Sequence, residues 1–235
     1  MLVLGIDTST KVGSLGLYDT EKGLIAENTM VLKQTHSERL MPLLENMLEM
    51  VDKTVHDLDG YAVAIGPGSF TGLRIGVTTA RTLAQITDKP IIGISTLKGT
   101  AFNLTTSGGL ICPIFDARNR RVYTSLFRGG EDEPERLRED YGCKIDKLLD
   151  DLKEEEENIY FVGDVVGQYQ TEIKEVLGEQ AKFPPRSLQI PKGGSFAQLG
   201  ANGLEKGQEV ELLKLTPNYL KPAQAELNWR KKHGK

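Results

Sequence analysis

A glycine-rich turn is the part of this sequence best suited to hold a ligand through backbone groups. Gly66, Pro67 and Gly68 follow the apolar segment 61–65, and Ser69 comes next. Pro67 has no amide proton and the glycines reach backbone angles closed to other residues, so a strand should end here. Amide protons at the start of a following helix attract anions, which makes phosphate the ligand that such a turn would bind.

The two common phosphate-binding motifs match this turn only in part. A Walker loop needs Lys followed by Ser or Thr after its last glycine, whereas Gly72 is followed by Leu73 and Arg74. A dinucleotide fingerprint counted from Gly66 places Thr71 where its third glycine belongs. A tight turn with close packing inside the domain therefore explains these residues as well as a ligand loop does.

The helix expected after the turn carries small residues at every fourth position. Gly72, Gly76, Ala80 and Ala84 form one stripe along it. Because no large side chain projects from this stripe, another backbone can approach it closely, and we interpret it as a docking surface. The alternative is that the stripe packs against the sheet of its own domain.

A second amphipathic helix precedes the turn. Thr35 and Glu38 have the spacing of a capping box, and Pro42 should bend the first turns. Apolar residues then recur with helical periodicity at Leu40, Leu43, Leu44, Met47, Leu48 and Val51. Together with Leu83 of the following helix, Leu43 and Met47 would supply apolar area beside the small-residue stripe.

The remaining elements indicate an internal duplication. Strands are predicted at 2–6, 13–18 and 24–32, followed by alternating helices and strands, which fits a mixed sheet with helices on its faces. Segment 110–115 ends in Asp116 and is followed by a returning strand, just as segment 2–6 ends in Asp7. We predict two related α/β lobes with a boundary near 103–109, so that the domains are 1–104, 105–217 and a C-terminal segment 218–235.

Composition limits the function classes. With 39% hydrophobic and 26% charged residues in 235, the chain can form real cores and a soluble surface. No apolar run approaches the roughly 20 residues of a membrane span, and the first residues are typical of a strand rather than a signal peptide. Only Cys112 and Cys143 occur, which fits a reducing cytoplasm. A net charge of −4 argues against an independent nucleic-acid binder, although the basic residues 230–235 could touch phosphate.

The stretch 61–81 closely resembles the signature of the bacterial TsaB (YeaZ) family. Further matches are Gly5-Ile6-Asp7-Thr8-Ser9, Thr35-His36-Ser37-Glu38-Arg39-Leu40-Met41-Pro42, Asp116-Ala117-Arg118-Asn119-Arg120-Arg121-Val122-Tyr123 and Pro217-Asn218-Tyr219-Leu220-Lys221. The resemblance implies a double α/β fold of the actin–hexokinase (ASKHA) type. It also implies that the two amphipathic helices pair with the equivalent helices of TsaD, through the interface residues Leu40, Leu43, Leu44, Met47, Gly72, Gly76, Ala80 and Leu83.

The function implied by the resemblance is that of a non-catalytic scaffolding and activating subunit. Such a subunit would partner TsaD and the ATPase TsaE in transferring a threonylcarbamoyl group to an adenosine of tRNA. It would need no cofactor of its own, although ATP or ADP could bind at the joint between subunits. The tRNA would be contacted only indirectly or through the basic tail, and the chain could also pair with itself, since two-fold homodimers are the commonest oligomers.

In actin–hexokinase ATPases, an aspartate after the first strand of each lobe helps to organise metal and phosphate. Here Asp7 and Asp116 occupy those places, but the turns lack the usual glycine, so we expect a degenerate nucleotide cleft. Its candidate contacts are Asp7, Thr8, Ser9, Gly66, Gly68, Ser69, Asp116 and Arg118. The alternative function is an ATPase or small-molecule kinase that works through the two aspartates. No metal is expected, because His36 is followed four positions later by Leu40 rather than by a second ligand, which also argues against a metallopeptidase.

Overall fold

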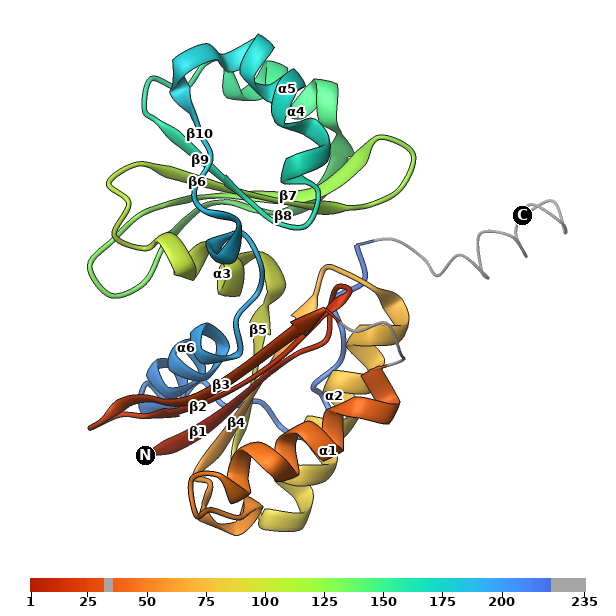
Figure 1. Cartoon of the computed structure of the whole chain (residues 1–235), viewed down its shortest axis with the longest axis vertical. Coiled ribbons are helices and arrows are strands. Elements are labelled where there is room, and N and C mark those ends of the chain that lie inside the picture. Colours follow the sequence, from red (N-terminus) through yellow and green to blue (C-terminus); the bar gives the residue numbers. More distant parts are fainter. Residues whose placement is uncertain (32–35, 221–235) are drawn as a thin grey trace, which may run out of the picture.

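The computed structural model describes residues 1–31 and 36–220 and shows two lobes stacked along the long axis of the molecule (Figure 1). The first half of the chain forms β1 (Leu2–Asp7), β2 (Val12–Asp19), β3 (Gly23–Val31), α1 (His36–Glu49), η1 (Val55–Asp57), β4 (Gly60–Gly66), α2 (Phe70–Thr87), β5 (Ile91–Ser95) and α3 (Thr96–Ala101). The second half forms η2 (Phe102–Leu104), β6 (Leu110–Asp116), β7 (Arg121–Arg128), β8 (Glu135–Lys144), α4 (Ile145–Leu152), β9 (Ile159–Val162), α5 (Val166–Leu177), η3 (Gly178–Gln180), β10 (Ala181–Lys182), η4 (Arg186–Leu188) and α6 (Gly193–Glu205).

Some residues singled out in the sequence lie outside this description. They are Thr35 of the predicted capping box, the side chain of His36, Lys221 and the basic residues 230–235. The predictions that depend on them stay predictions. No helix in the described part of the chain is long and apolar enough to cross a membrane.

The two lobes repeat one topology. The first sheet has the strand order β3-β2-β1-β4-β5, and the second has β8-β7-β6-β9-β10 when it is read from its own antiparallel end. In each lobe three antiparallel strands are followed by two strands parallel to the first of them. The predicted fold class, two related α/β lobes with mixed sheets and flanking helices, is confirmed.

The last helix of each repeat crosses to the other lobe. Helix α6 packs on β1, β2, β4 and β5 of the first sheet, where Phe196 is fully buried beside Val3 and Ala62. Helix α3 instead packs on the second sheet, where Leu97 and Ala101 are buried with strand residues of β6 and β7. The assignment of residues 105–217 to the second lobe is therefore wrong for α6, because its apolar face is covered by the first sheet.

Glycines bring α6 unusually close to that sheet. A Cβ on Gly5 or Gly16 would overlap backbone atoms of α6, and the amide of Gly193 donates to the hydroxyl of Ser14 at 2.6 Å. This contact fixes the helix start against the middle of β1 and β2.

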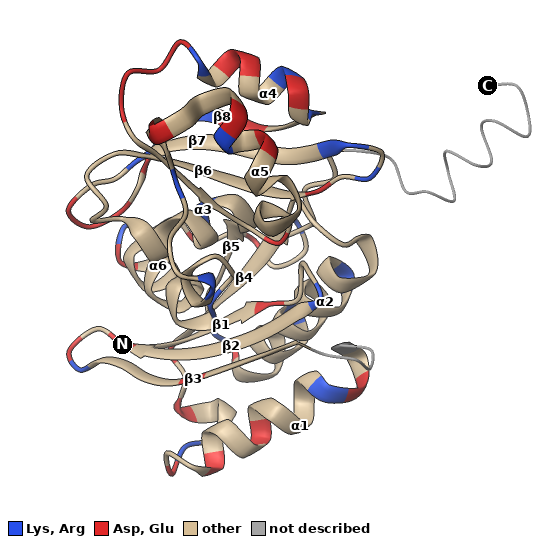
Figure 2. Ribbon diagram, turned by 45° about the horizontal axis from the view of Figure 1, so that its top comes forward, with Lys and Arg blue, Asp and Glu red and all other residues tan. Residues whose placement is uncertain are grey.

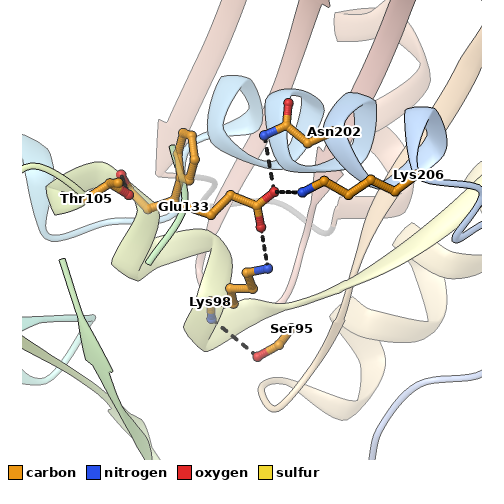
Figure 3. A network of polar contacts seen from close by, with 7 residues as sticks. Ser95, Lys98, Thr105, Glu133, Asn202 and Lys206 are labelled. Atoms are coloured by element: carbon orange, nitrogen blue, oxygen red, sulfur yellow. Dashed lines mark hydrogen bonds and ion pairs between the residues drawn. The ribbon is translucent and has the colours of Figure 1, made fainter. Parts of the chain in front are cut away.

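A partly buried ionic network fastens the second lobe to both crossing helices (Figure 3). Glu133, in the loop between β7 and β8, accepts hydrogen bonds from Lys98 of α3 at 2.6 Å, and from Asn202 of α6 and Lys206 directly after it at 3.2 Å each. Since its side chain is only 21% exposed, these bonds are partly shielded from water.

The chain after α6 returns along the first lobe. The amide of Val210 donates to the carbonyl of Ile91 at 2.9 Å, and Leu215 is buried in the core beneath α1 and α2. The amide of Asn218 then donates to the carbonyl of Ile65 at 2.6 Å. Residues 206–219 thus complete the first lobe, so the predicted boundary at 217/218 does not separate two structural units.

Candidate functional site

The first strand of each lobe ends in an aspartate, as the sequence predicts. Asp7, Thr8 and Ser9 are buried at the end of β1. One carboxylate oxygen of Asp7 accepts from the Ser9 amide at 3.1 Å, whereas Oδ2 has no hydrogen-bond partner among the described residues. Burial without full hydrogen bonding disfavours the charge and raises the pKa of Asp7 from 3.8 to about 6.

The glycine-rich turn closes over these residues. The Ser69 amide donates to the Ser9 carbonyl at 2.6 Å, and a Cβ on Gly68 would overlap that same carbonyl oxygen. The Ser69 side chain accepts from the amide of Gly72 at 3.3 Å and so caps α2. The structure therefore brings together the predicted residues of this turn, Asp7, Thr8, Ser9, Gly66, Gly68 and Ser69. The Ser69 amide proton, which could otherwise bind a phosphate, is thus bonded to a carbonyl of the same chain.

The turn after β6 in the second lobe, which corresponds to Asp7–Ser9 of the first lobe, lies exposed at the surface. Asp116 accepts from the amide of Arg118 at 2.8 Å, and the Arg118 guanidinium lies 3.4 Å from the carboxylate of Asp116 with 84% of its side chain exposed. Arg118, Asn119 and Arg120 all have left-handed backbone angles, with φ of 63°, 54° and 56°. Such residues each cost about 1–2 kcal/mol, so the turn is held by its surroundings. Part of that support comes from Arg120, which donates to Asp146 of α4 and Glu172 of α5 at 2.8 and 2.7 Å.

Sequence reasoning missed a third aspartate at this site. Asp164 follows β9, and its carboxylate accepts from the amide of Asp116 at 3.1 Å. Burial, with a further contribution from the charge of Asp116, raises the pKa of Asp164 to about 6, while Lys11 of the first lobe acts in the opposite direction. The duplication offered a signal in the sequence, because Gly163 after β9 corresponds to Gly66 at the end of β4. Both glycines have positive φ, 116° and 112°.

The small-residue stripe lies inside the first lobe rather than on its surface. A Cβ on Gly72 would overlap the carbonyl oxygen of Thr8, and one on Gly76 would meet the Thr8 hydroxyl and lie 3.6 Å from Val63. The other predicted interface residues Leu40, Leu44, Met47, Ala80 and Leu83 are buried in the same core, and Leu43 is half-buried against it. The interpretation of the stripe as an exposed docking surface is therefore wrong, because Thr8, directly after β1, and Val63 of β4 occupy the space beside it.

Comparison with known proteins identifies the family. The family model described as "TsaD: tRNA N6-adenosine threonylcarbamoyltransferase" matches residues 25–229. The tRNA threonylcarbamoyladenosine biosynthesis protein TsaB of Bacillus subtilis is 36% identical over 97% of this chain and 98% of its own length. The chain belongs to the TsaB (YeaZ) family. The TsaB of Haemophilus influenzae is 29% identical over the whole of this chain and 98% of its own length.

Solved structures agree with the fold of this TsaB-family chain. A Pseudomonas aeruginosa protein described as similar to peptidase YEAZ superposes with a TM-score of 0.81 at 22% identity, over 94% of this chain and 99% of its own. The activator of 2-hydroxyisocaproyl-CoA dehydratase from Clostridium difficile, solved with bound ADPNP, superposes with a TM-score of 0.52 at 11% identity, over 88% and 97% of the two chains. At these identities the likeness concerns the fold alone.

The surface of α1 and α2 that remains accessible carries different residues from those predicted. Met41 of α1, Met50 directly after α1 and Ile86 of α2 are 46%, 77% and 64% exposed. A groove of about 710 Å³ lies beside α1, lined by Met41, Leu44, Leu48 and Val55 together with Glu45 and Glu49 of α1 and polar residues of the following loop. Figure 2 shows acidic residues spaced along α1, whereas the outward face of α2 consists largely of Thr71, Arg74, Thr78, Thr82, Gln85 and Ile86.

Neither metal ligation nor thiol chemistry is supported within residues 1–31 and 36–220. No three His, Cys, Asp or Glu side chains of this part lie close enough to hold a metal ion. Both cysteines are buried, and burial raises the pKa of Cys112 to about 12, so its thiol stays protonated and is a poor nucleophile.

Proposed function

We propose that this chain is a non-catalytic, activating subunit in the biosynthesis of threonylcarbamoyladenosine in tRNA, acting in the cytoplasm with a TsaD-like catalytic subunit and a TsaE-like ATPase. The observation that carries the proposal is the 36% identity with the B. subtilis TsaB over nearly the full length of both chains. The match of residues 25–229 to the TsaD family model supports a TsaD-like partner, since the partner would share the lobes and helices of this chain.

The closed turn of the first lobe supports a non-catalytic role. A nucleotide bound in the manner of an actin–hexokinase ATPase would need amide protons and space beside Asp7. In this chain the Ser69 amide is bonded to Ser9, and the glycines of the turn are packed against Thr8 and Ser9. The chain would therefore have no cofactor of its own. ATP or ADP would bind at the joint with the partner, where the exposed Arg118 could reach a phosphate.

We place the partner on the outward faces of α1 and α2. The exposed Met41, Met50 and Ile86 supply apolar area that the chain itself does not cover. The exposed threonines of α2 are short, so a partner helix could pack closely against this face. The family resemblance implies the same two helices, although the side that faces the partner is opposite to the small-residue stripe.

Light-scattering mass after chromatography of the chain mixed with TsaD from the same source tests this proposal. We expect a 1:1 species with the native chain and its loss with Thr78→Arg, because a long charged side chain would stand on the exposed face of α2. Thr171→Arg is the matched control, since Thr171 is an exposed threonine of α5 in the other lobe. A mixed species that survives Thr78→Arg would place the interface elsewhere, and the absence of any mixed species would contradict the subunit role.

An ATPase or small-molecule kinase is the second candidate function. The observation that favours it is the unpartnered Oδ2 of the buried Asp7, at the place where such enzymes organise metal and phosphate. Equilibrium binding of a fluorescent ATP analogue with magnesium to the isolated chain tests it. Tight binding that Asp7→Ala abolishes would support this function over the accessory role.

A further inference from the structure

A groove of about 620 Å³ lies at the joint of the two lobes. Its walls come from α6, from η2 and the residues after it, and from the loop between β7 and β8. Helix α6 covers the face of the first sheet opposite to the one that α1 and α2 cover (Figure 1). The groove is therefore separate from the surface on which we place the partner, and none of the aspartates of the candidate site lines it.

Two aromatic side chains form the apolar part of this groove. Tyr18, near the end of β2, and Phe102, the first residue of η2, are half-buried because they pack against the core around Phe196. The part of each side chain that this core does not cover lines the groove. The face of an aromatic ring attracts a cation, and its apolar surface also accepts an aliphatic chain.

Carboxylates from two separate elements line the groove and lack a charged partner. Glu131 and Asp132 belong to the loop between β7 and β8, and Glu205 is the last residue of α6. None of the three forms an ion pair within the described part of the chain. The ammonium group of Lys206, which also lines the groove, is bound to Glu133 at 3.2 Å (Figure 3). The groove therefore carries an excess of negative charge, which favours a cation as its ligand.

The arrangement of these carboxylates favours an organic cation over a metal ion. Among the described residues, no three His, Cys, Asp or Glu side chains lie close enough to hold a metal ion. Carboxylates on separate elements, combined with aromatic side chains and with the neutral polar side chains of Thr106 and Gln198, fit ammonium groups that are joined by an aliphatic chain.

We propose that this groove binds a small organic cation with two or more amines, of the polyamine class. One ammonium group would bind Glu131 and Asp132, a second would bind Glu205, and the aliphatic chain between them would lie on Tyr18 and Phe102. Such a ligand would contact α6 on the first sheet and a loop of the second lobe at the same time. It would therefore stabilise the present arrangement of the two lobes. This inference does not depend on the proposed function.

Isothermal titration of the full chain with spermidine, without tRNA and at low salt, tests this site. We expect saturable binding of one spermidine per chain. The double variant Glu131→Gln and Glu205→Gln should raise the dissociation constant roughly tenfold or more, because each change removes a hydrogen bond between charged groups. The matched control is the double variant Glu154→Gln and Glu156→Gln, which removes the same charge from exposed residues between α4 and β9 and should bind like the native chain. Phe102→Leu keeps an apolar side chain but removes the ring, so it should weaken binding about two- to fivefold.

Two further ligands and a thermal readout separate this site from diffuse attraction to an acidic surface. Butylamine has a single amine and should bind far more weakly than spermidine, and an equal concentration of magnesium chloride should not displace spermidine. Spermidine should also raise the Tm of the native chain and of the control, but not that of the variant lacking the Glu131 and Glu205 charges. The absence of saturable binding, an equal loss in both double variants, or displacement by magnesium would each overturn the proposal.

Discussion

The packing of α2 on the Thr8 turn predicts that Gly72→Ala destabilises the chain. The added Cβ would overlap the carbonyl oxygen of Thr8 and lie 3.1 Å from its carbonyl carbon. The Thr8 backbone cannot easily withdraw, because its own hydroxyl donates to the carbonyl of Gly72 at 2.7 Å and thus ties the turn to the helix. Gly167 of α5 offers the matched control, since a Cβ there meets nothing within 4 Å.

Two opposing effects set the magnitude. Replacing a helical glycine by alanine gains up to about 1 kcal/mol of helix propensity. Overpacking a close contact costs about 1–3 kcal/mol and occasionally more, and a clash with backbone belongs at the upper end. We therefore expect Gly72→Ala to lower the free energy of unfolding by about 2 kcal/mol and Gly167→Ala to raise it by up to about 1 kcal/mol.

Urea denaturation followed by far-UV circular dichroism measures both variants. The midpoint should fall for Gly72→Ala and rise for Gly167→Ala, with unchanged slopes. If Gly72→Ala were as stable as the native chain, α2 could not sit on the Thr8 turn. The small-residue stripe would then be free to meet a partner, and our placement of the interface on the outward face of α2 would lose its basis.

Charged groups provide three more predictions. The pKa of Asp7 is raised from 3.8 to about 6 on folding, so stability is lost as the pH rises from about 4 to about 6. Asp7→Asn should therefore raise the free energy of unfolding at pH 7 by up to about 3 kcal/mol and leave it unaltered near pH 3. Equal stability of the variant and the native chain at pH 7 would refute this. For Glu133, burial opposes the charge, but hydrogen bonds from Lys98 and its neighbours outweigh burial and lower the pKa of the carboxyl. Glu133→Gln should therefore lower the free energy of unfolding by about 1 kcal/mol at neutral pH. In urea titrations this difference should disappear once the pH falls below the lowered pKa. Exchanging the Lys and Arg residues of 230–235 for Gln should weaken tRNA binding by the assembly with TsaD. The slope of log affinity against log salt concentration should become smaller by roughly 0.7–0.9 for each phosphate that the tail neutralises. An unchanged slope would show that the tail does not touch tRNA.

The sequence predicted the duplication but not the exchange of the last helices. Periodicity shows that a helix buries one face, but it does not show which sheet covers that face. The signal for α6 was the Gly193-Gly194 pair at its start, which packs against Gly5 and Gly16 of the first sheet. The sequence does not show that glycines in two distant segments contact each other. The predicted boundary at 217/218 was therefore based on the duplication and not on the packing.

The candidate site was predicted in its residues and only partly in its role. The turn residues Asp7, Ser9 and Gly68 do come together, because they follow parallel neighbouring strands whose ends meet. The small stripe correctly indicated a close backbone approach, but composition cannot distinguish an approach by the same chain from one by a partner. Asp164 was missed because its role depends on the fold that carries it to the amide of Asp116.

The rate of threonylcarbamoyladenosine formation in a reconstituted mixture tests the accessory role most directly. The mixture would contain TsaD, TsaE, tRNA and the threonylcarbamoyl donor, with and without this chain. We predict that the rate depends on the chain and that the double variant Asp7→Ala and Asp116→Ala, which leaves the outward faces of α1 and α2 untouched, supports the native rate. Loss of the rate by a double variant that still forms the 1:1 species with TsaD would show that this chain takes part in the chemistry and would contradict the account.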